Sequence, residues 1–153
     1  MVPFKAILTF ALISAAVANP VEQPAAVENP LEKRDTIVQC HNVALRADQQ
    51  RISVDNAKWQ LGHAPIETGK SGYPHDFQNL QKLPMPQGCK NKALREYPVF
   101  MEQHKLYDYD SRPKMNPGPF RVIATKETRL FCVIISHDGQ GTNPNAGNFH
   151  LCT

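Results

Sequence analysis

Hydrophobic side chains gather in three short runs in the second half of the chain. Residues 95–101, 119–125 and 129–136 are rich in the β-branched and aromatic residues that favour strands, and the third run is the strongest. A long polar, proline-rich connection, 102–118, separates the first two runs, and a segment rich in glycine and asparagine, 138–147, follows the third. This pattern predicts antiparallel strands joined by long loops.

The first half of the chain has one good helical segment, 54–61. Its apolar side chains recur at roughly helical spacing, at Val54, Ala57, Leu61 and, less well placed, Trp59. Gly62 follows as an expected helix stop. Residues 35–46 alternate loosely and suit a strand or one arm of a hairpin, whereas 63–73 and 81–90 are rich in Pro, Gly, Lys and Gln and are expected to be loops. One short α-helix with several antiparallel strands predicts an α+β domain.

The N-terminus reads as a secretory signal peptide over residues 1–18. Lys5 supplies a positive charge, an apolar run follows it, and Ala16 and Ala18 place small residues where signal peptidase reads them. The run is too short to span a bilayer. A buried N-terminal helix is the alternative, but nothing later in the chain would pack against so one-sided an opening.

Residues 19–34 form a segment of different composition, with three prolines, three glutamates and no aromatic residue. Such a segment buries too little apolar surface to offset its chain entropy. It ends at Lys33-Arg34, where the patterned sequence begins. A dibasic pair can arise by chance, but this position favours a propeptide, with a mature secreted domain over 35–153. No later apolar run approaches the length of a membrane helix.

The chain has four cysteines, Cys40, Cys89, Cys132 and Cys152. An even number in a secreted chain predicts two disulfides, and spacing alone leaves all three pairings open. Zinc is the competing interpretation, which the absence of any CxxC spacing disfavours. The net charge of +3 lies entirely in residues 35–153, because the acidic and basic residues of 1–34 cancel. This mildly basic balance permits nucleic-acid binding without requiring it.

Three charged residues in or beside the predicted strands have apolar neighbours. In ideal strands Glu96 shares a face with Pro98 and Phe100, Arg121 with Ile123, and His137 with Val133 and Ile135. Charged groups in such surroundings need partners, which adjacent antiparallel strands can provide. RNA cleavage by internal transesterification needs a base, an acid and a cation for the phosphate, so this set suits it. Each residue taken alone is more often structural.

Several segments in order add a family resemblance. They are TGKSGYPHDFQN (68–79), LREYPVF (94–100), DSRPKMNPGPFRVIAT (110–125), LFCVIISH (130–137) and NFHLC (148–152). Their order and spacing resemble the sarcin-type fungal ribotoxins and the smaller guanyl-specific extracellular fungal ribonucleases. The short region between Cys40 and Tyr73 is similar to a compact, hirsutellin-like variant. The resemblance implies a microbial ribonuclease fold, with a short helix packed on an antiparallel sheet.

The resemblance also assigns roles to individual residues. Glu96 matches the general base and His137 the general acid, and no metal or other cofactor takes part. The residues expected to stabilise the phosphate and support the base are Tyr73, His75 and Arg121. Those expected to contact the rest of the substrate are Phe77, Asn79 and, beside the leaving phosphate, Phe149. The implied disulfides are Cys40–Cys152 and Cys89–Cys132.

The long connection over 102–118 resembles the basic loop with which ribotoxins grip the ribosome. We expect Arg112, Lys114 and Asn116 to contact RNA phosphates, although a merely solvated loop is the alternative. Two departures bear on specificity. The loop over 80–95 is shorter than in sarcin, and Gln81 stands where the guanyl-specific enzymes have an acid that reads guanine.

The function implied is that of a secreted endoribonuclease that leaves a 2′,3′-cyclic phosphate. As a ribotoxin it would be a monomer that cuts large-subunit ribosomal RNA in the cytosol of a target cell, with acidic membrane lipids as further partners on the way in. The alternatives are a general secreted ribonuclease, leaning towards guanine, and a non-catalytic effector that binds RNA or ribosomes.

Overall fold

Residues 35–153 are the part of the chain that the computed structural model describes, so the predicted signal peptide and propeptide lie outside the described residues. The elements, in order, are β1 (Ile37–Gln39), the 3-10 helix η1 (Ala47–Gln49), β2 (Arg51–Ser53), α1 (Val54–His63), β3 (His75–Phe77), β4 (Leu94–Pro98), β5 (Phe120–Thr125), β6 (Phe131–His137) and β7 (Phe149–Leu151). The predicted α+β class is confirmed.

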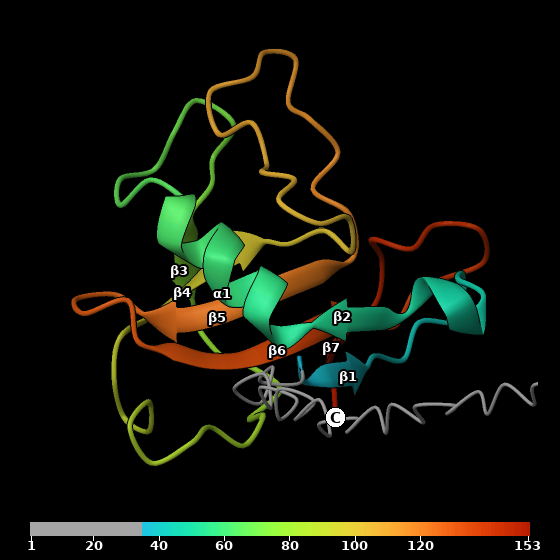
Figure 1. Ribbon diagram of the computed structural model, residues 1–153, viewed down its shortest axis with the longest axis horizontal. Coiled ribbons are helices and arrows are strands. Elements are labelled where there is room, and N and C mark those ends of the chain that lie inside the picture. The colour runs from blue at the N-terminus through green and yellow to red at the C-terminus, as the bar shows by residue number, and fades with distance from the viewer. Residues whose placement is uncertain (1–34) are drawn as a thin grey trace, which may run out of the picture. The chain divides into compact units, whose positions relative to one another are not determined.

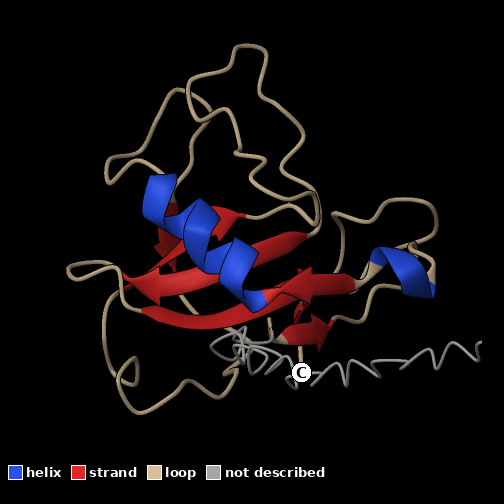
Figure 2. Cartoon of the chain, viewed as in Figure 1, coloured by secondary structure: helices blue, strands red, loops and turns tan. Residues whose placement is uncertain are grey.

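The strands form two antiparallel sheets. β1 pairs with β2 alone, and a five-stranded sheet has the order β3-β4-β5-β6-β7, so neighbours in sequence are neighbours in space. In Figure 1, α1 crosses in front of this sheet, and Figure 2 shows how much of the remaining chain is loop. The three hydrophobic runs of the sequence correspond to β4, β5 and β6, the middle of the sheet, although β4 ends at Pro98 and residues 99–101 of the first run lie outside it.

The helix begins where the sequence predicts and ends slightly later. Ser53 caps it, accepting a hydrogen bond from the backbone N–H of Asn56 at 2.9 Å. The prediction that Gly62 stops the helix is wrong, because α1 continues through it to His63. The helix ends at Ala64, whose backbone is extended (φ −70°, ψ 151°) because Pro65 disfavours the helical conformation in the residue before it.

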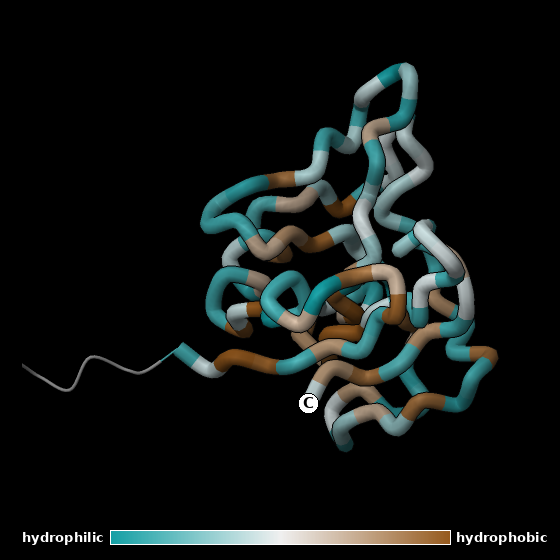
Figure 3. Tube along the Cα trace, turned by 90° about the vertical axis from the view of Figure 1, so that its right-hand side faces the viewer, coloured by the Kyte–Doolittle hydropathy of each residue, from teal (hydrophilic) through white to brown (hydrophobic). Residues whose placement is uncertain are grey.

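The five-stranded sheet has a different apolar layer on each face. On one face α1 covers the helix-side core, whose buried members from the sheet include Tyr97, Val122 and Ile134. On the other face lies the site-side cluster, with buried members Phe77, Cys89, Leu94, Ile123, Cys132 and Ile135. Figure 3 shows apolar stretches in the middle of the trace and also along its margins, alternating with hydrophilic ones. Since side chains alternate along a strand, Glu96, Arg121 and His137 fall on the site-side face.

Both disulfides form, with the pairing that the family resemblance implies. Cys40–Cys152 ties the two ends of the domain across a sequence separation of 112 residues. A loop of that length stabilises the folded state by about 4–5 kcal/mol in the chain-entropy treatment. Cys89–Cys132 fastens the loop between β3 and β4 to β6, beside an irregularity in the β5–β6 register at Ile123 and Ala124.

Buried amides of α1 hold the start of the long 102–118 loop. Gln60 donates to the carbonyl of Phe100 at 2.8 Å and accepts from its N–H at 3.0 Å. Asn56 donates to the carbonyl of Glu102 at 3.2 Å and accepts from the N–H of His104 at 3.0 Å. The loop therefore leaves the sheet from a fixed point. Within residues 35–153, no helix has the length and apolar character that crossing a membrane requires.

A buried asparagine locks the loop that follows β6. Asn42, 1% exposed, donates to the carbonyls of His137 at 2.7 Å and Pro144 at 2.8 Å. Its side-chain oxygen leaves no room for a Cβ at Gly139, where one would stand 2.4 Å away. Contacts between residues far apart in the sequence thus fix the backbone conformation at His137.

Asn42→Ala is expected to lower the free energy of unfolding by about 1–3 kcal/mol, because it removes the hydrogen bonds that this buried amide donates to the carbonyls of His137 and Pro144. Urea denaturation of the mature domain measures the change. Asn148→Ala is the matched control, since Asn148 is exposed and its loss should cost less than about 0.5 kcal/mol. Equal stability of the two variants would contradict the role given to Asn42.

Candidate active site

A buried arginine lies at the centre of the predicted site. Arg121, on β5, is 2% exposed, and its Nη1 donates to the carbonyls of Gly118 at 2.6 Å and Phe120 at 2.8 Å. Its Nη2 donates to the hydroxyl of Tyr73 at 3.1 Å. The NPGP segment before β5 thus serves a structural purpose, because its backbone carbonyls orient the guanidinium. Tyr73 is itself buried, 5% exposed.

Glu96 faces this arginine from β4. Its Oε1 lies 3.4 Å from Arg121 Nε, and the two side chains are 6% and 2% exposed. Arg121 Nε has no hydrogen-bond partner, so the contact is an ion pair without hydrogen-bond geometry. The β4–β5 register pairs Glu96 with Ile123 and Pro98 with Arg121, which agrees with the predicted faces of both residues.

The same carboxylate oxygen meets a histidine on the other side. His75, opposite Glu96 in the β3–β4 register, has its Nε2 3.2 Å from Glu96 Oε1. Its ring stacks on Tyr73 with centroids 4.7 Å apart, and its Nδ1 is 3.2 Å from the carbonyl of Asp76. Nε2 of the same ring faces the carboxylate. Glu96 therefore lies between the guanidinium of Arg121 and the imidazole of His75, with His75 on the exposed side.

Burial and neighbouring charge act in opposite directions on Glu96. Desolvation, the larger effect, raises the pKa of Glu96 above its ordinary value of 4.5, while the nearby charges of Arg121, His75 and Lys114 pull it down. The raised pKa makes the carboxylate a stronger base than an exposed one. Glu96 is buried and held in place, and it lies next to the exposed His75. This arrangement suits a base that removes a proton from a hydroxyl.

His137 ends β6 at the far side of the site. Its Nδ1 is 3.1 Å from the carbonyl of Gly147, which fixes Nδ1 as a donor and leaves Nε2 to carry the transferable proton. Its ring packs on Phe149, its partner in the β6–β7 register, with centroids 4.0 Å apart. Desolvation lowers the pKa of His137 below its ordinary value of 6.5. A histidinium so placed gives up its proton readily.

The long loop contributes one of its three predicted residues to the site. Lys114 Nζ lies 4.4 Å from the centroid of the Tyr73 ring, a cation–π contact that places its charge beside Glu96. The side-chain oxygen of Asn116 is engaged elsewhere, accepting from Asn145 at 2.7 Å and from the N–H of Gly118 at 3.0 Å. Arg112 is exposed on the loop. The structure thus brings Lys114 to the site and leaves Arg112 and Asn116 outside it.

A cavity of about 240 Å³ opens beside Glu96. Its lining residues are Asp76, Phe77, Gln78, Asn79, Leu80, Gln81, Glu96 and Phe149. Asp76, Gln78 and Leu80 were not predicted from the sequence; all three are exposed, Leu80 at 77%. Asn79 shapes the wall of the cavity, because its amide is bound to the backbone of Leu83 at 2.8 and 2.9 Å.

The geometry meets the requirements of acid–base chemistry on a phosphodiester. A base and an acid flank a fixed guanidinium, and the cavity beside the base has the aromatic and amide groups that hold a nucleobase. The register has brought together all five residues predicted to be catalytic, Tyr73, His75, Glu96, Arg121 and His137. Their individual roles stay predictions.

These pKa directions predict a narrow, acidic activity optimum. With Glu96 as the predicted base and His137 as the predicted acid, cleavage would need Glu96 deprotonated and His137 protonated, so kcat/KM should fall below an acid-limb pKa above 4.5 and above an alkaline-limb pKa below 6.5. A pH profile on a dinucleotide substrate measures both limbs. His63→Gln, a change on the far end of α1, should leave the profile unaltered. A plateau from below pH 4.5 to above pH 6.5 would show that these groups do not control the rate.

The comparisons with known proteins agree with this geometry. A family model described as ribonuclease matches residues 33–153. A ribonuclease from Arthroderma benhamiae is 44% identical, over 99% of this chain and 99% of its own. Ribonuclease alpha-sarcin from Aspergillus giganteus is 32% identical, over 84% of this chain and 89% of its own. The ribotoxin restrictocin, solved in complex with a 29-mer sarcin/ricin domain RNA analogue, has a TM-score of 0.64 and 27% identity, covering 77% of this chain and 99% of that one.

Fold and comparisons together define the class of protein, an RNA endonuclease in which one helix covers an antiparallel sheet. The family model that matches residues 33–153 also identifies the family. The chain belongs to the ribonuclease family, of the type found in the fungal ribotoxins.

Proposed function

We propose that the protein is a secreted ribotoxin that cuts one phosphodiester bond in the conserved loop of large-subunit ribosomal RNA. Its relatives include alpha-sarcin, and restrictocin is described as a ribotoxin and was solved with a sarcin/ricin domain RNA analogue. A single cut in RNA that the ribosome needs inhibits translation. The protein acts as a monomer.

The observation that carries this proposal is the reach of the long loop into the site. Lys114 comes from the 102–118 loop and lies on the ring of Tyr73, so one loop bears both a surface cation, Arg112, and a cation at the reaction centre. RNA held along the loop by its phosphates is thereby aligned with the site. A site formed by strand residues alone would lack this link between RNA bound on the loop and the catalytic residues.

The reaction is an internal transesterification. Glu96 removes the proton of a ribose 2′-hydroxyl, whose oxygen then attacks the adjacent phosphorus. Arg121 and the Tyr73 hydroxyl stabilise the charge on the phosphoryl oxygens, while Nε2 of His137 protonates the departing 5′-oxygen. The products are a 2′,3′-cyclic phosphate and a free 5′-hydroxyl. The nucleophile is part of the substrate, so the step calls for no metal-bound water.

Intact eukaryotic ribosomes and naked RNA, each treated with the mature domain in chelator, test the proposal. We expect one discrete fragment from the large-subunit RNA of ribosomes, and none with Glu96→Gln. Lys114→Gln should weaken selectivity for ribosomes more than cleavage of a dinucleotide. Equal ladders on both substrates would replace the ribotoxin with a general ribonuclease, and activity lost to the chelator would refute the proposed chemistry.

A general secreted ribonuclease is the second candidate function, and the open cavity beside Glu96 favours it. The amides of Gln78 and Gln81 line this cavity, and an amide can both donate and accept hydrogen bonds. Unlike a carboxylate, such groups suit either purine. We therefore propose a preference for guanine over adenine of less than about 10-fold, which kcat/KM on paired GpC and ApC substrates measures. A preference above about 10³-fold would contradict the proposed tolerance of either purine.

We further propose that the full chain is exported, cleaved after Ala18 and again after Arg34. N-terminal sequencing of the protein from culture medium should then begin at Asp35. Acidic lipids are the proposed partners on the way into a target cell, since the net charge is +3. Binding of the mature domain to anionic but not neutral vesicles, lost at high salt, is the expected result.

A further inference from the structure

A second cavity, larger than the first, lies beside the loop between β3 and β4. Its volume is about 480 Å³, within the range of small-molecule sites. It shares the wall Phe77–Asn79 with the cavity next to Glu96 and contains neither Glu96 nor Phe149. The two cavities therefore adjoin, with the second farther from the catalytic groups. None of the chemistry described above uses it.

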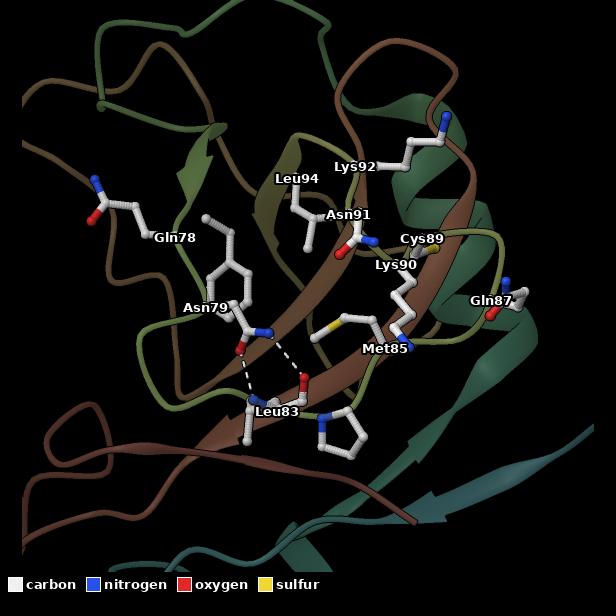
Figure 4. Close-up of a pocket in the computed structure, with 12 residues that line it drawn as sticks. Gln78, Asn79, Leu83, Met85, Gln87, Cys89, Lys90, Asn91, Lys92 and Leu94 are labelled. Carbon is white, nitrogen blue, oxygen red and sulfur yellow. Dashed lines mark hydrogen bonds between the residues drawn. The ribbon is translucent and has the colours of Figure 1, made fainter.

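The floor of this second cavity is apolar and rigid. Phe77, Cys89 and Leu94 are 9%, 1% and 8% exposed, and the Cys89–Cys132 disulfide holds the loop against the sheet. Leu83 and Met85 complete it from the loop. Figure 4 shows Met85 and Leu94 around the middle of the cavity, with Asn79 bonded to the Leu83 backbone at its edge. Such a floor suits the face of a flat ring.

The rim carries polar groups that have no partner among the described residues. Lys90 and Asn91 both line the cavity, and neither side chain takes part in an ion pair or hydrogen bond within 35–153. Figure 4 places the Lys90 chain beside Met85, whereas Lys92 extends away from them. Asn91 has φ 59°, so a strained turn presents its amide. An amide and an ammonium beside an apolar floor match a base edge and a phosphate.

The direction of the RNA follows from the catalytic groups. The nucleotide whose 2′-hydroxyl is deprotonated lies at Glu96, with its base in the first cavity, and the leaving nucleotide lies at His137. The strand on the 5′ side therefore continues away from His137, past Phe77–Asn79. We propose that the second cavity binds the nucleotide immediately 5′ of the cleaved one, its base on Met85 and Leu94, its edge at Asn91 and its phosphate at Lys90. This inference rests on the proposed ribonuclease function and adds a subsite to it.

The subsite is tested by pairing a dinucleotide with a trinucleotide. GpC fills only the catalytic positions, whereas ApGpC adds one nucleotide on the 5′ side. We expect the wild type to cleave ApGpC with a kcat/KM about 10-fold above that for GpC. Lys90→Gln/Asn91→Gly should remove most of this gain and leave GpC cleavage unchanged, since glycine keeps the turn without the amide. Lys58→Gln, on α1 across the sheet, is the matched control.

Each outcome has a distinct meaning. Equal wild-type rates on the two substrates would overturn the subsite while leaving the ribonuclease intact. A double variant that loses activity on GpC and ApGpC alike would also overturn it, because a folding or long-range charge effect then explains the loss. A thermal melt of the variant separates those two causes. No cleavage of either substrate by the wild type would overturn the proposed function and the subsite with it.

Discussion

Glu96→Gln is expected to lower kcat/KM for RNA cleavage by about 10²- to 10⁴-fold, the usual contribution of a general base. Glutamine keeps the shape and can still face His75 and Arg121, but it cannot accept the 2′-hydroxyl proton. Initial rates on GpC measure the loss. Glu127→Gln, which neutralises an exposed acid in the β5–β6 turn, is the matched control and should retain full activity.

His137→Gln should have an effect of similar size, for the opposite proton transfer. If the two residues act as one unit, the double variant should be little worse than either single one. Residual activity in Glu96→Gln above about one tenth of the wild type would mean that another group, with His75 the nearest candidate, removes the proton. The rate of Glu96→Gln thus shows whether Glu96 or His75 removes the proton of the 2′-hydroxyl.

Arg121→Gln is the second substitution with a large expected effect, because this arginine serves catalysis and stability together. Loss of the positive charge at the phosphate should cost about 10²- to 10³-fold in kcat. Removing one partner of a buried ion pair should also cost about 3–5 kcal/mol in the free energy of unfolding. Steady-state kinetics and urea denaturation of the same preparation give both numbers.

The charge of Arg121 is also the strongest of the influences that lower the pKa of Glu96. Its removal should therefore raise that pKa further, moving the acid limb of the pH profile to higher pH. Arg121→Lys is the informative control, since it restores the charge without the planar fork. It should recover the acid limb but not the full rate. An unchanged acid limb in Arg121→Gln would contradict the contact between the two side chains.

The central strands could be predicted because strand-favouring residues are concentrated in those parts of the sequence. Strands β5 and β6 are runs rich in apolar and β-branched residues, and alternation along them and along β4 places Glu96, Arg121 and His137 on one face. The edge strands β3 and β7 have three residues each, too few for a pattern to show. Neither strand was predicted from the sequence.

The contacts that complete the site could not be predicted from local sequence. Lys114 reaches Tyr73 across 41 positions of sequence because buried amides of α1 fix where the loop departs. The proton on His137 is set by a backbone carbonyl, Gly147, which leaves no trace in residue type. Gly62 failed as a helix stop because Pro65, two residues beyond the helix, decides the ending.

The burial of the disulfides bears on survival in a reducing compartment. Cys89 and Cys132 are 1% and 6% exposed, whereas the Cys40–Cys152 bond joins a buried cysteine to the half-buried Cys152. A thiolate must approach a disulfide sulfur to exchange with it, so burial of both cysteines limits the rate at which glutathione opens Cys89–Cys132. Reduction of that bond then has to wait for the domain to open. If the chain is exported and acts on ribosomes as proposed, it would thereby keep Cys89–Cys132 in the cytosol after acquiring the bond during export.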